Sequence, residues 1–334
     1  MLIPAADSHR LFFYKQETID SLVSFSEMTI QNEEENKMAK TNTIFEGVAT
    51  ALITPMTEDG VNFEQFGKLI DWQIEQGIDA LVIAGTTGEG STLTDEEHKA
   101  CISFAVERAA HRIPIIAGTG SNHTEYGKQL TKYASDAGAD ACLIVTSYYN
   151  KATQNGLVKL FEEYASVSDV PIIAYNVPSR TGLNIEPSTY AKLAKIDKVA
   201  AIKEANSNIS KIVDTFALVG DSMDIYSGND DQIVPFLSMG GKGVISVLSN
   251  VIPAETKEIC TKFWEGDVAG SAALQCKYNE LVKALFCEVN PIPVKEALAM
   301  MGWCDPIIRS PLYRMEEANL ERLRKAMEDL GIIG

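Results

Sequence analysis

The stretch Val199-Ala200-Ala201-Ile202-Lys203-Glu204-Ala205 is an apolar, strand-forming run that ends abruptly in a lysine. Such a run is typical of a buried β-strand with an amine at its tip. Similar short runs recur at intervals of roughly 20–33 residues, which is the scale of one strand plus one helix. With the quoted stretch included, we predict eight strands, over residues 48–53, 80–84, 113–118, 141–146, 171–176, 199–203, 224–227 and 243–247.

The segments between these runs have the end signals of helices. Helices predicted over residues 63–76 and 124–137 are each followed by a glycine, and Thr94-Asp95-Glu96-Glu97 has the pattern of a capping box. Eight strands alternating with helices favour an α/β fold of the (β/α)8 TIM barrel type over a doubly wound sheet. Further helices are predicted over residues 268–285, 293–301 and 315–330. We therefore expect a barrel over residues 45–266 and a C-terminal helical subdomain over residues 267–334.

Residues 1–44 differ in character from the rest of the chain. Gln31-Asn32-Glu33-Glu34-Glu35-Asn36-Lys37 is polar and acidic, and no basic start precedes an apolar core. We expect a poorly ordered tail rather than a secretory signal, with a short helix around residues 18–28 and an alternative start at Met38.

Composition excludes several classes of function. The formal net charge is −17, which disfavours nucleic acid and anionic membrane surfaces as partners. No apolar run approaches the roughly 20 residues that a membrane span needs. The six cysteines are scattered and the four histidines lack metal-ligand spacing, so nothing in the sequence requires a metal. We expect a cytoplasmic enzyme in a reducing compartment.

The residues that carry chemistry follow the predicted strands, where the active site of a barrel lies. Burial would lower the pKa of Lys203 and make its amine a nucleophile that condenses with a ketone, although a strand-end lysine can also point into water. Strand ends also hold Gly85-Thr86-Thr87-Gly88-Glu89-Gly90, Tyr148-Tyr149-Asn150 and Tyr175-Asn176-Val177-Pro178-Ser179-Arg180. Each motif alone has a structural explanation, but their joint placement favours a functional site.

These motifs resemble those of the pyruvate-dependent class I aldolases and, within that group, of the 4-hydroxy-tetrahydrodipicolinate synthases, formerly called dihydrodipicolinate synthases. The resemblance runs from about Phe45 to the C-terminus and leaves out the tail. It implies a lyase that condenses pyruvate with L-aspartate 4-semialdehyde in lysine and diaminopimelate biosynthesis. It implies no cofactor, because a covalent imine between a lysine and pyruvate activates the substrate.

The resemblance assigns roles to individual residues. Lys203 would form the imine, and Tyr175, Thr86 and Tyr149 would relay protons, with Tyr149 supplied across a dimer interface. Thr87 and the carbonyl of Ile245 would line the pyruvate pocket. Arg180 would hold the carboxylate of the second substrate through paired hydrogen bonds. The expected assembly is a homotetramer built as a dimer of dimers.

Three alternatives stay open at this point. The sugar-acid branches of the same family share the lysine, but they generally lack an arginine matching Arg180. A non-catalytic barrel could bind a small carboxylate, although the presence of every expected catalytic residue argues against it. A phosphate-binding isomerase would need a phosphate loop where Asn229-Asp230-Asp231 is acidic.

The family's regulatory lysine site has partial counterparts in this chain. Asn122, Tyr148 and His98 match it, whereas Asp95 and Tyr126 replace a histidine and a glutamate. Because that glutamate would pair with a ligand ammonium, we expect weak or absent inhibition by lysine.

Overall fold

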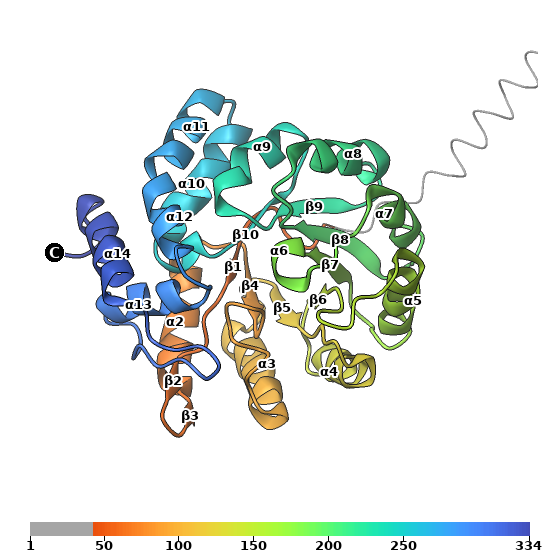
Figure 1. The fold of residues 1–334 in the computed structure, drawn as a ribbon, viewed down its shortest axis with the longest axis horizontal. Helices are drawn as coiled ribbons and strands as arrows, with labels where there is room; N and C mark the ends of the chain where they lie inside the picture. The colour runs from red at the N-terminus through yellow and green to blue at the C-terminus, as the bar shows by residue number, and fades with distance from the viewer. Residues whose placement is uncertain (1–42) are drawn as a thin grey trace, which may run out of the picture. The chain divides into compact units, whose positions relative to one another are not determined.

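The computed structural model describes residues 43–334 (Figure 1). The helix predicted around residues 18–28 and all of the predicted tail up to residue 42 lie outside the described residues.

Eight parallel strands close into a barrel, as the sequence predicts. The ladder runs in the order β1, β10, β9, β8, β7, β6, β5 and β4, and β4 returns to β1. Nearly all strand residues are buried, which is the pattern of strands covered by helices on one side and by the barrel core on the other. The strands are β1 (Gly47–Ala51), β4 (Ala80–Ile83), β5 (Ile115–Gly118), β6 (Ala141–Val145), β7 (Ile172–Asn176), β8 (Val199–Glu204), β9 (Asp224–Ser227) and β10 (Gly243–Ser246).

Helices surround the barrel (Figure 1). The predicted capping box is present: the amide of Glu97 donates to Thr94 Oγ1 at 3.2 Å, and the amide of Thr94 donates to Glu97 Oε2 at 2.9 Å. The surrounding helices are α2 (Phe63–Glu75), α3 (Asp95–Ala109), α4 (Thr124–Asp136), α5 (Gln154–Ala165), α7 (Pro187–Leu193), α8 (Ile209–Val219), α9 (Ile233–Ser238) and α10 (Pro253–Trp264). Shorter pieces are the hairpin β2 (Met56–Thr57) and β3 (Gly60–Val61), the helix α6 (Pro178–Thr181), and the 3-10 turns η1 (Asp230–Gln232) and η2 (Leu248–Asn250).

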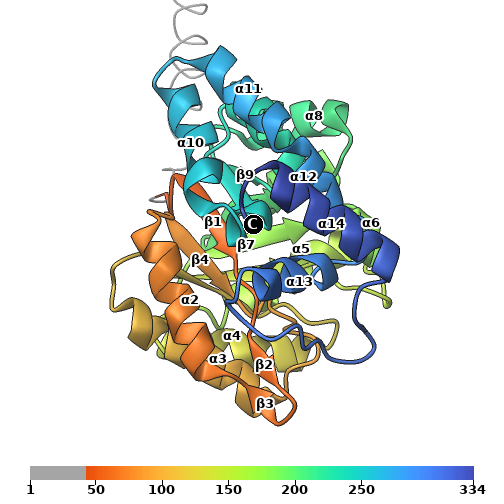
Figure 2. The same cartoon turned by 90° about the vertical axis from the view of Figure 1, so that its left-hand side faces the viewer.

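The C-terminal region is helical, but one predicted helix is wrong. The single helix expected over residues 268–285 is two helices, α11 (Val268–Lys277) and α12 (Asn279–Leu285). The backbone leaves helical geometry at Tyr278 (ψ 2°), whose side chain is buried in the core. Helices α13 (Ile292–Met300) and α14 (Glu317–Asp329) follow, and α14 packs on α12 and α13 (Figure 2). Since α12 and α13 also contact η2 of the barrel, the boundary at residue 266 remains a prediction.

Two hydrophobic layers fill the structure. The barrel interior combines small residues such as Ala49 and Ala201 with large ones such as Tyr175 and Tyr226. The ring of Phe45 stacks on Tyr226 with centroids 4.2 Å apart, and the Tyr226 hydroxyl donates to the carbonyl of Phe45 at 2.8 Å. Phe45 therefore packs against the interior just before β1 begins, which leaves the carboxyl ends of the strands for a site.

A buried ion pair joins the C-terminal helices to a turn at the carboxyl end of the barrel. The ammonium of Lys295 in α13 donates to the carboxylate of Glu89, and both side chains are almost fully buried. Lys295 also donates to the carbonyl of Ile307 at 2.6 Å, and the amide of Arg309 donates to Glu89 Oε2 at 3.0 Å. The turn that contains Thr86 and Thr87 is thus held from outside by chain more than 200 residues away in the sequence.

The substitution Lys295→Met should destabilise the protein strongly. It keeps most of the side-chain volume but leaves the Glu89 carboxylate buried without its cation, which typically costs about 3–5 kcal/mol. We expect a loss of this size in the free energy of unfolding, measured by urea denaturation at fixed protein concentration. Lys68→Met is the control, because Lys68 pairs with Glu64 on the surface and should change stability little. Equal stability of both variants would show that the buried pair does not secure the turn.

Candidate active site

Lys203 lies next to the end of β8 and is 6% exposed. Burial lowers its pKa to about 7, with a further lowering from Arg180 and an opposing contribution from the carboxylate of Asp230. A large fraction of the amine is therefore neutral at neutral pH, which a nucleophilic lysine requires. The alternative of a solvated lysine at a strand end does not fit this burial.

Tyr175 is the neighbour of Lys203 on the adjacent strand. The two residues are register partners between β7 and β8, and the Lys203 Nζ lies 4.4 Å from the centroid of the Tyr175 ring. Burial raises the pKa of Tyr175, whereas Arg180 and the hydroxyl of Thr86 lower it. A phenol that stays protonated beside a neutral amine can donate a proton to a reacting oxygen.

A cavity of about 170 Å³ surrounds these groups. It brings together five of the predicted site residues: Thr86, Thr87, Tyr175, Arg180 and Lys203. They come from the ends of β4, β7 and β8 and from α6, so segments far apart in the sequence meet at one point. The small volume suits a substrate of few atoms.

The backbone around the Thr86–Thr87 turn has an unusual conformation that includes one required glycine. Ala84 and Glu89 on either side of it have positive φ angles of 54° and 56°. A Cβ at Gly90 would lie 2.1 Å from the carbonyl oxygen of Ala84, so this position requires glycine. Left-handed backbone at residues other than glycine is costly and is found most often at functional sites.

Asn290 is a site residue that sequence reasoning missed. Its side-chain Nδ2 donates to Thr87 Oγ1 at 3.0 Å, and its backbone carbonyl accepts from Arg180 Nη2 at 3.1 Å. It also lines the cavity beside them. Asn290 stands in the C-terminal region between α12 and α13, and no strand pattern or spacing in the sequence connects it to the barrel.

Two predicted residues do not line this cavity. Ile245 packs in the barrel interior in the same cluster as Tyr175, and Val247 forms the cavity wall at this strand end. Tyr149 is 93% exposed, with a φ of 68°. The roles given to Ile245 and Tyr149 therefore stay predictions.

The predicted regulatory residues lie partly in a second cavity of about 530 Å³. His98 and Tyr148 line it, together with Asp95 and Tyr126, whereas Asn122 does not. The His98 ring nitrogen Nε2 lies 2.8 Å from the carbonyl of Gly118, and burial lowers the pKa of His98. Thr86, Tyr175 and Arg180 line this cavity as well as the first, so the two share a wall.

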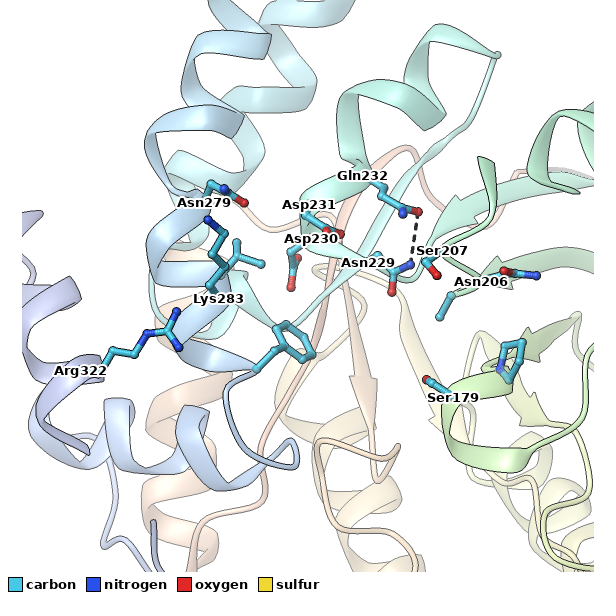
Figure 3. Close-up of a pocket in the computed structure, with 14 residues that line it drawn as sticks. Ser179, Asn206, Ser207, Asn229, Asp230, Asp231, Gln232, Asn279, Lys283 and Arg322 are labelled. Carbon is cyan, nitrogen blue, oxygen red and sulfur yellow. Dashed lines mark hydrogen bonds between the residues drawn. The ribbon is translucent and has the colours of Figure 1, made fainter. Parts of the chain in front are cut away.

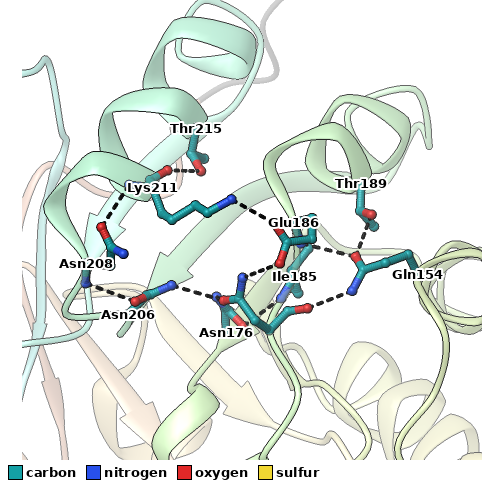
Figure 4. A network of polar contacts seen from close by, with 10 residues as sticks. Gln154, Asn176, Ile185, Glu186, Thr189, Asn206, Asn208, Lys211 and Thr215 are labelled. Atoms are coloured by element: carbon teal, nitrogen blue, oxygen red, sulfur yellow. Dashed lines mark hydrogen bonds and ion pairs between the residues drawn. The ribbon is translucent and has the colours of Figure 1, made fainter.

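Behind the nucleophile, Glu204 is the centre of a buried polar network. Its carboxylate accepts from the Tyr190 hydroxyl at 2.8 Å, from the Asn206 amide at 2.8 Å and from Asn176 Nδ2 at 2.9 and 3.1 Å. Asn176 and Asn206 in turn both donate to Asn184. Figure 4 shows Asn176 and Asn206 in the wider polar network that also contains Glu186. The network fixes the segments that follow β7 and β8, which carry Arg180 and Ala205 of the cavity. Sequence reasoning missed this role of Glu204.

Within residues 43–334, no group of three or more histidine, cysteine, aspartate or glutamate side chains could hold a metal ion. None of the helices in this part of the chain is long and apolar enough to cross a membrane.

A closed parallel barrel that presents a buried, partly neutral lysine beside a protonated tyrosine has the arrangement of a Schiff-base aldolase. The sequence agrees with this class: the profile of the Dihydrodipicolinate synthetase family matches residues 44–330. The chain belongs to this family, and the predicted class, a lyase of the class I aldolase type, is confirmed.

Individual relatives support the same assignment. A 4-hydroxy-tetrahydrodipicolinate synthase of Lachnoclostridium phytofermentans is 52% identical over 292 residues, covering 87% of this chain and 99% of the relative. The crystal structure of a chloride-inhibited dihydrodipicolinate synthase from Acinetobacter baumannii in complex with pyruvate is 43% identical, with a TM-score of 0.85, covering 87% of this chain and 100% of that one. The structure of a monomeric dihydrodipicolinate synthase variant is 40% identical, with a TM-score of 0.85 and coverages of 87% and 98%.

Glu204 should make stability depend on pH. Burial raises its pKa from 4.5 to about 7, against the hydrogen bonds from Tyr190, Asn206 and Asn176. A carboxyl whose pKa is higher in the folded state stabilises the fold fully below its unfolded pKa and loses that contribution as the pH rises through about 7. We therefore expect the difference in the free energy of unfolding between Glu204→Gln and the wild type to move in favour of the variant as the pH rises from 5 to 8. Urea denaturation at each pH measures this difference.

The control is Glu186→Gln. Glu186 belongs to the same network, but hydrogen bonds with Asn184 and Lys211 lower its pKa from the ordinary value, so its carboxylate is the charged form in this pH range. Its stability difference from the wild type should be flat over the same range. A flat difference for Glu204→Gln as well would mean that Glu204 is ionised throughout.

Proposed function

We propose that this protein condenses pyruvate with L-aspartate 4-semialdehyde to give 4-hydroxy-tetrahydrodipicolinate through an imine at Lys203. The observation that carries the proposal is the buried Lys203 amine, with a pKa of about 7, at a strand end in a chain of this family. Relatives about 50% identical over nearly their whole length are named 4-hydroxy-tetrahydrodipicolinate synthase.

The first step is attack of the neutral Lys203 amine on the keto carbon of pyruvate. The carbinolamine then loses its hydroxyl as water, and this step needs a proton that Tyr175 is placed to supply. Thr86 contacts Tyr175 and would pass a proton on, and Tyr149 of a neighbouring subunit would complete the relay. The product is an iminium that withdraws electrons from the adjacent methyl group.

Pyruvate would be held by its carboxylate at the Thr86–Thr87 turn. The turn is rigid, since Asn290 donates to Thr87 and the pair of Glu89 with Lys295 fixes its far side. The carbonyl of Ile245 would complete the pocket as the resemblance implies.

Loss of a methyl proton converts the iminium into an enamine, whose carbon attacks the aldehyde of L-aspartate 4-semialdehyde. Arg180, held by the carbonyl of Asn290, would receive the carboxylate of this second substrate with paired hydrogen bonds. The amino group of that substrate then attacks the imine carbon, which closes the ring and releases Lys203. No metal or separate cofactor takes part, because the covalent imine supplies the electron sink.

Replacing Lys203 should abolish the reaction. Purified protein with pyruvate and L-aspartate 4-semialdehyde, coupled to a reductase that consumes NADPH, should turn over, and Lys203→Ala should not. Borohydride should trap pyruvate on the wild type only. Because the neutral amine is the reactive form, trapping should fall about tenfold per pH unit well below pH 7.

Absence of turnover in folded wild-type protein would overturn the proposed substrate pair. Trapping of pyruvate without turnover would then direct the search to sugar acids. No trapping at all would favour a binding role.

We also propose that the enzyme works as a homotetramer, a dimer of dimers, located in the cytoplasm. Support comes from Tyr149, whose ring is 93% exposed and does not line the cavity of its own chain. The monomeric variant among the related structures makes the oligomeric state of this chain a matter for measurement. Weak inhibition by lysine, expected from Asp95 and Tyr126, is tested by titration with lysine.

Mixed oligomers test whether Tyr149 acts across an interface. Lys203→Ala and Tyr149→Phe should each be nearly inactive alone. In a mixed dimer, one site would combine an intact Lys203 with an intact Tyr149 from the partner, so activity should return when the two variants are dissociated and reassembled together. If Tyr149 acts only within its own chain, both sites of the mixed dimer stay defective and no activity returns.

A further inference from the structure

An outer cleft of about 610 Å³, distinct from the cavity at His98, opens beside the Lys203 cavity (Figure 3). The two share four lining residues: Ser179, Ala205, Asn229 and Phe286. The cleft is therefore continuous with the wall of the inner cavity and forms the outer part of the same opening. Its far wall comes from the C-terminal helices α12 and α14, which contribute Asn279, Lys283 and Arg322. None of the reaction steps above uses these helices.

Arg322 supplies a cation on this wall, and the charge of its guanidinium also acts on the carboxylate of Glu280 in α12, where Lys283 and, to a smaller extent, Arg322 lower the pKa. Within the part of the chain that the structure describes, its guanidinium makes no ion pair or hydrogen bond, whereas Lys283 is paired with Glu280 at 2.6 Å. Figure 3 shows the Arg322 side chain extending from α14 toward the cleft. A guanidinium binds a carboxylate through two parallel hydrogen bonds, so Arg322 suits a carboxylate better than a lysine ammonium would.

Asp231 supplies an anion from the barrel side of the cleft. Its side chain is exposed, and among residues 43–334 its carboxylate has no hydrogen bond or ion pair. The backbone beneath it is fixed, because Gln275 donates to the carbonyl of Asp231 at 2.5 Å. The neighbouring Asp230 differs: its carboxylate is buried and accepts from Ser246 and from the amides of Val247 and Leu248.

Because these opposite charges lie on two walls of one cleft, we propose that the cleft is an outer docking site for an α-amino acid. The carboxylate of the ligand would bind Arg322 and its ammonium would bind Asp231. A cleft of this volume accommodates such a molecule, and side-chain amides and hydroxyls of Asn206, Ser207 and Gln232 line the rest. Resting on the proposed function, the occupant is L-aspartate 4-semialdehyde on its way to the inner cavity.

The charge pattern separates the two substrates. Pyruvate is an anion without an ammonium group, so Asp231 would repel it, and the net charge of −17 does not attract it. A zwitterion satisfies both charges of the cleft at once. The site would therefore raise the local concentration of the second substrate without competing for the first.

The test is steady-state kinetics of Arg322→Gln and Asp231→Asn at low ionic strength. Each variant should lower kcat/KM for L-aspartate 4-semialdehyde about five-fold, the size of one partly exposed charged contact, while kcat and the KM for pyruvate stay within about two-fold. Arg324→Gln is the matched control, because Arg324 lies on the same helix, pairs with Glu321 and does not line the cleft.

A competitor that lacks the ammonium group separates the two contacts. Inhibition by 4-oxobutanoate, which keeps the carboxylate and the aldehyde, should weaken in Arg322→Gln and not in Asp231→Asn.

Unchanged kcat/KM in both variants, or an equal effect on both substrates, would overturn the docking site. If the wild type itself makes no product, the proposed function fails instead, so the two failures are distinguishable.

Discussion

The desolvation of one amine is the constraint on which the site depends. In water an ammonium ion is strongly favoured, and only burial at the carboxyl end of β8 brings the pKa of Lys203 down to about 7. That burial needs the barrel to close around it, with Tyr175 against the amine on the neighbouring strand and the phenol kept protonated by the same low polarity. The carboxylate of Asp230 opposes the shift, so the amine is lowered to the neutral range and no further. The amine of Lys203 and the phenol of Tyr175 thus owe their protonation states to one physical cause, burial.

A buried amine is useful only if its surroundings are rigid, and two networks provide this from opposite sides. The Glu89–Lys295 pair fixes the Thr86–Thr87 turn from the C-terminal helices. The hydrogen bonds to Glu204 fix the segments that follow β7 and β8. Both networks place a carboxylate out of water and surround it with donors, which is the condition under which buried charge is tolerated. The C-terminal helices are therefore part of the architecture of the site, although they carry none of the groups that react.

The sequence predicts the parts of this arrangement that arise locally. A strand has a short apolar signature, and barrel geometry then puts Lys203, Tyr175, Thr86 and Arg180 at one end without further information. It does not predict Asn290, Lys295 or the partners of Glu204, because these contacts join residues that only the folded chain brings together. The break between α11 and α12 was not predicted for a similar reason. The local sequence has the pattern of one continuous helix, whereas the backbone leaves helical geometry at Tyr278, whose side chain is buried. Tyr149 is the opposite case: its motif is clear in the sequence, but its side chain is 93% exposed and lines neither cavity, so its role across an interface stays a prediction.

Burial sets the protonation states at the centre of the site, and charged side chains line the cleft that leads to it. The protein is strongly acidic, yet its opening carries Arg180 inside and Arg322 outside, on different elements, and neither forms a contact ion pair within residues 43–334. Asp231 adds a negative charge to the outer part of this opening, so the opening presents charges of both signs. A zwitterionic substrate would find an opposite charge for each of its groups in such an opening, whereas a simple anion or cation would be repelled by one of the two charges. With the proposed docking site, selectivity between the two substrates would begin before either reaches Lys203.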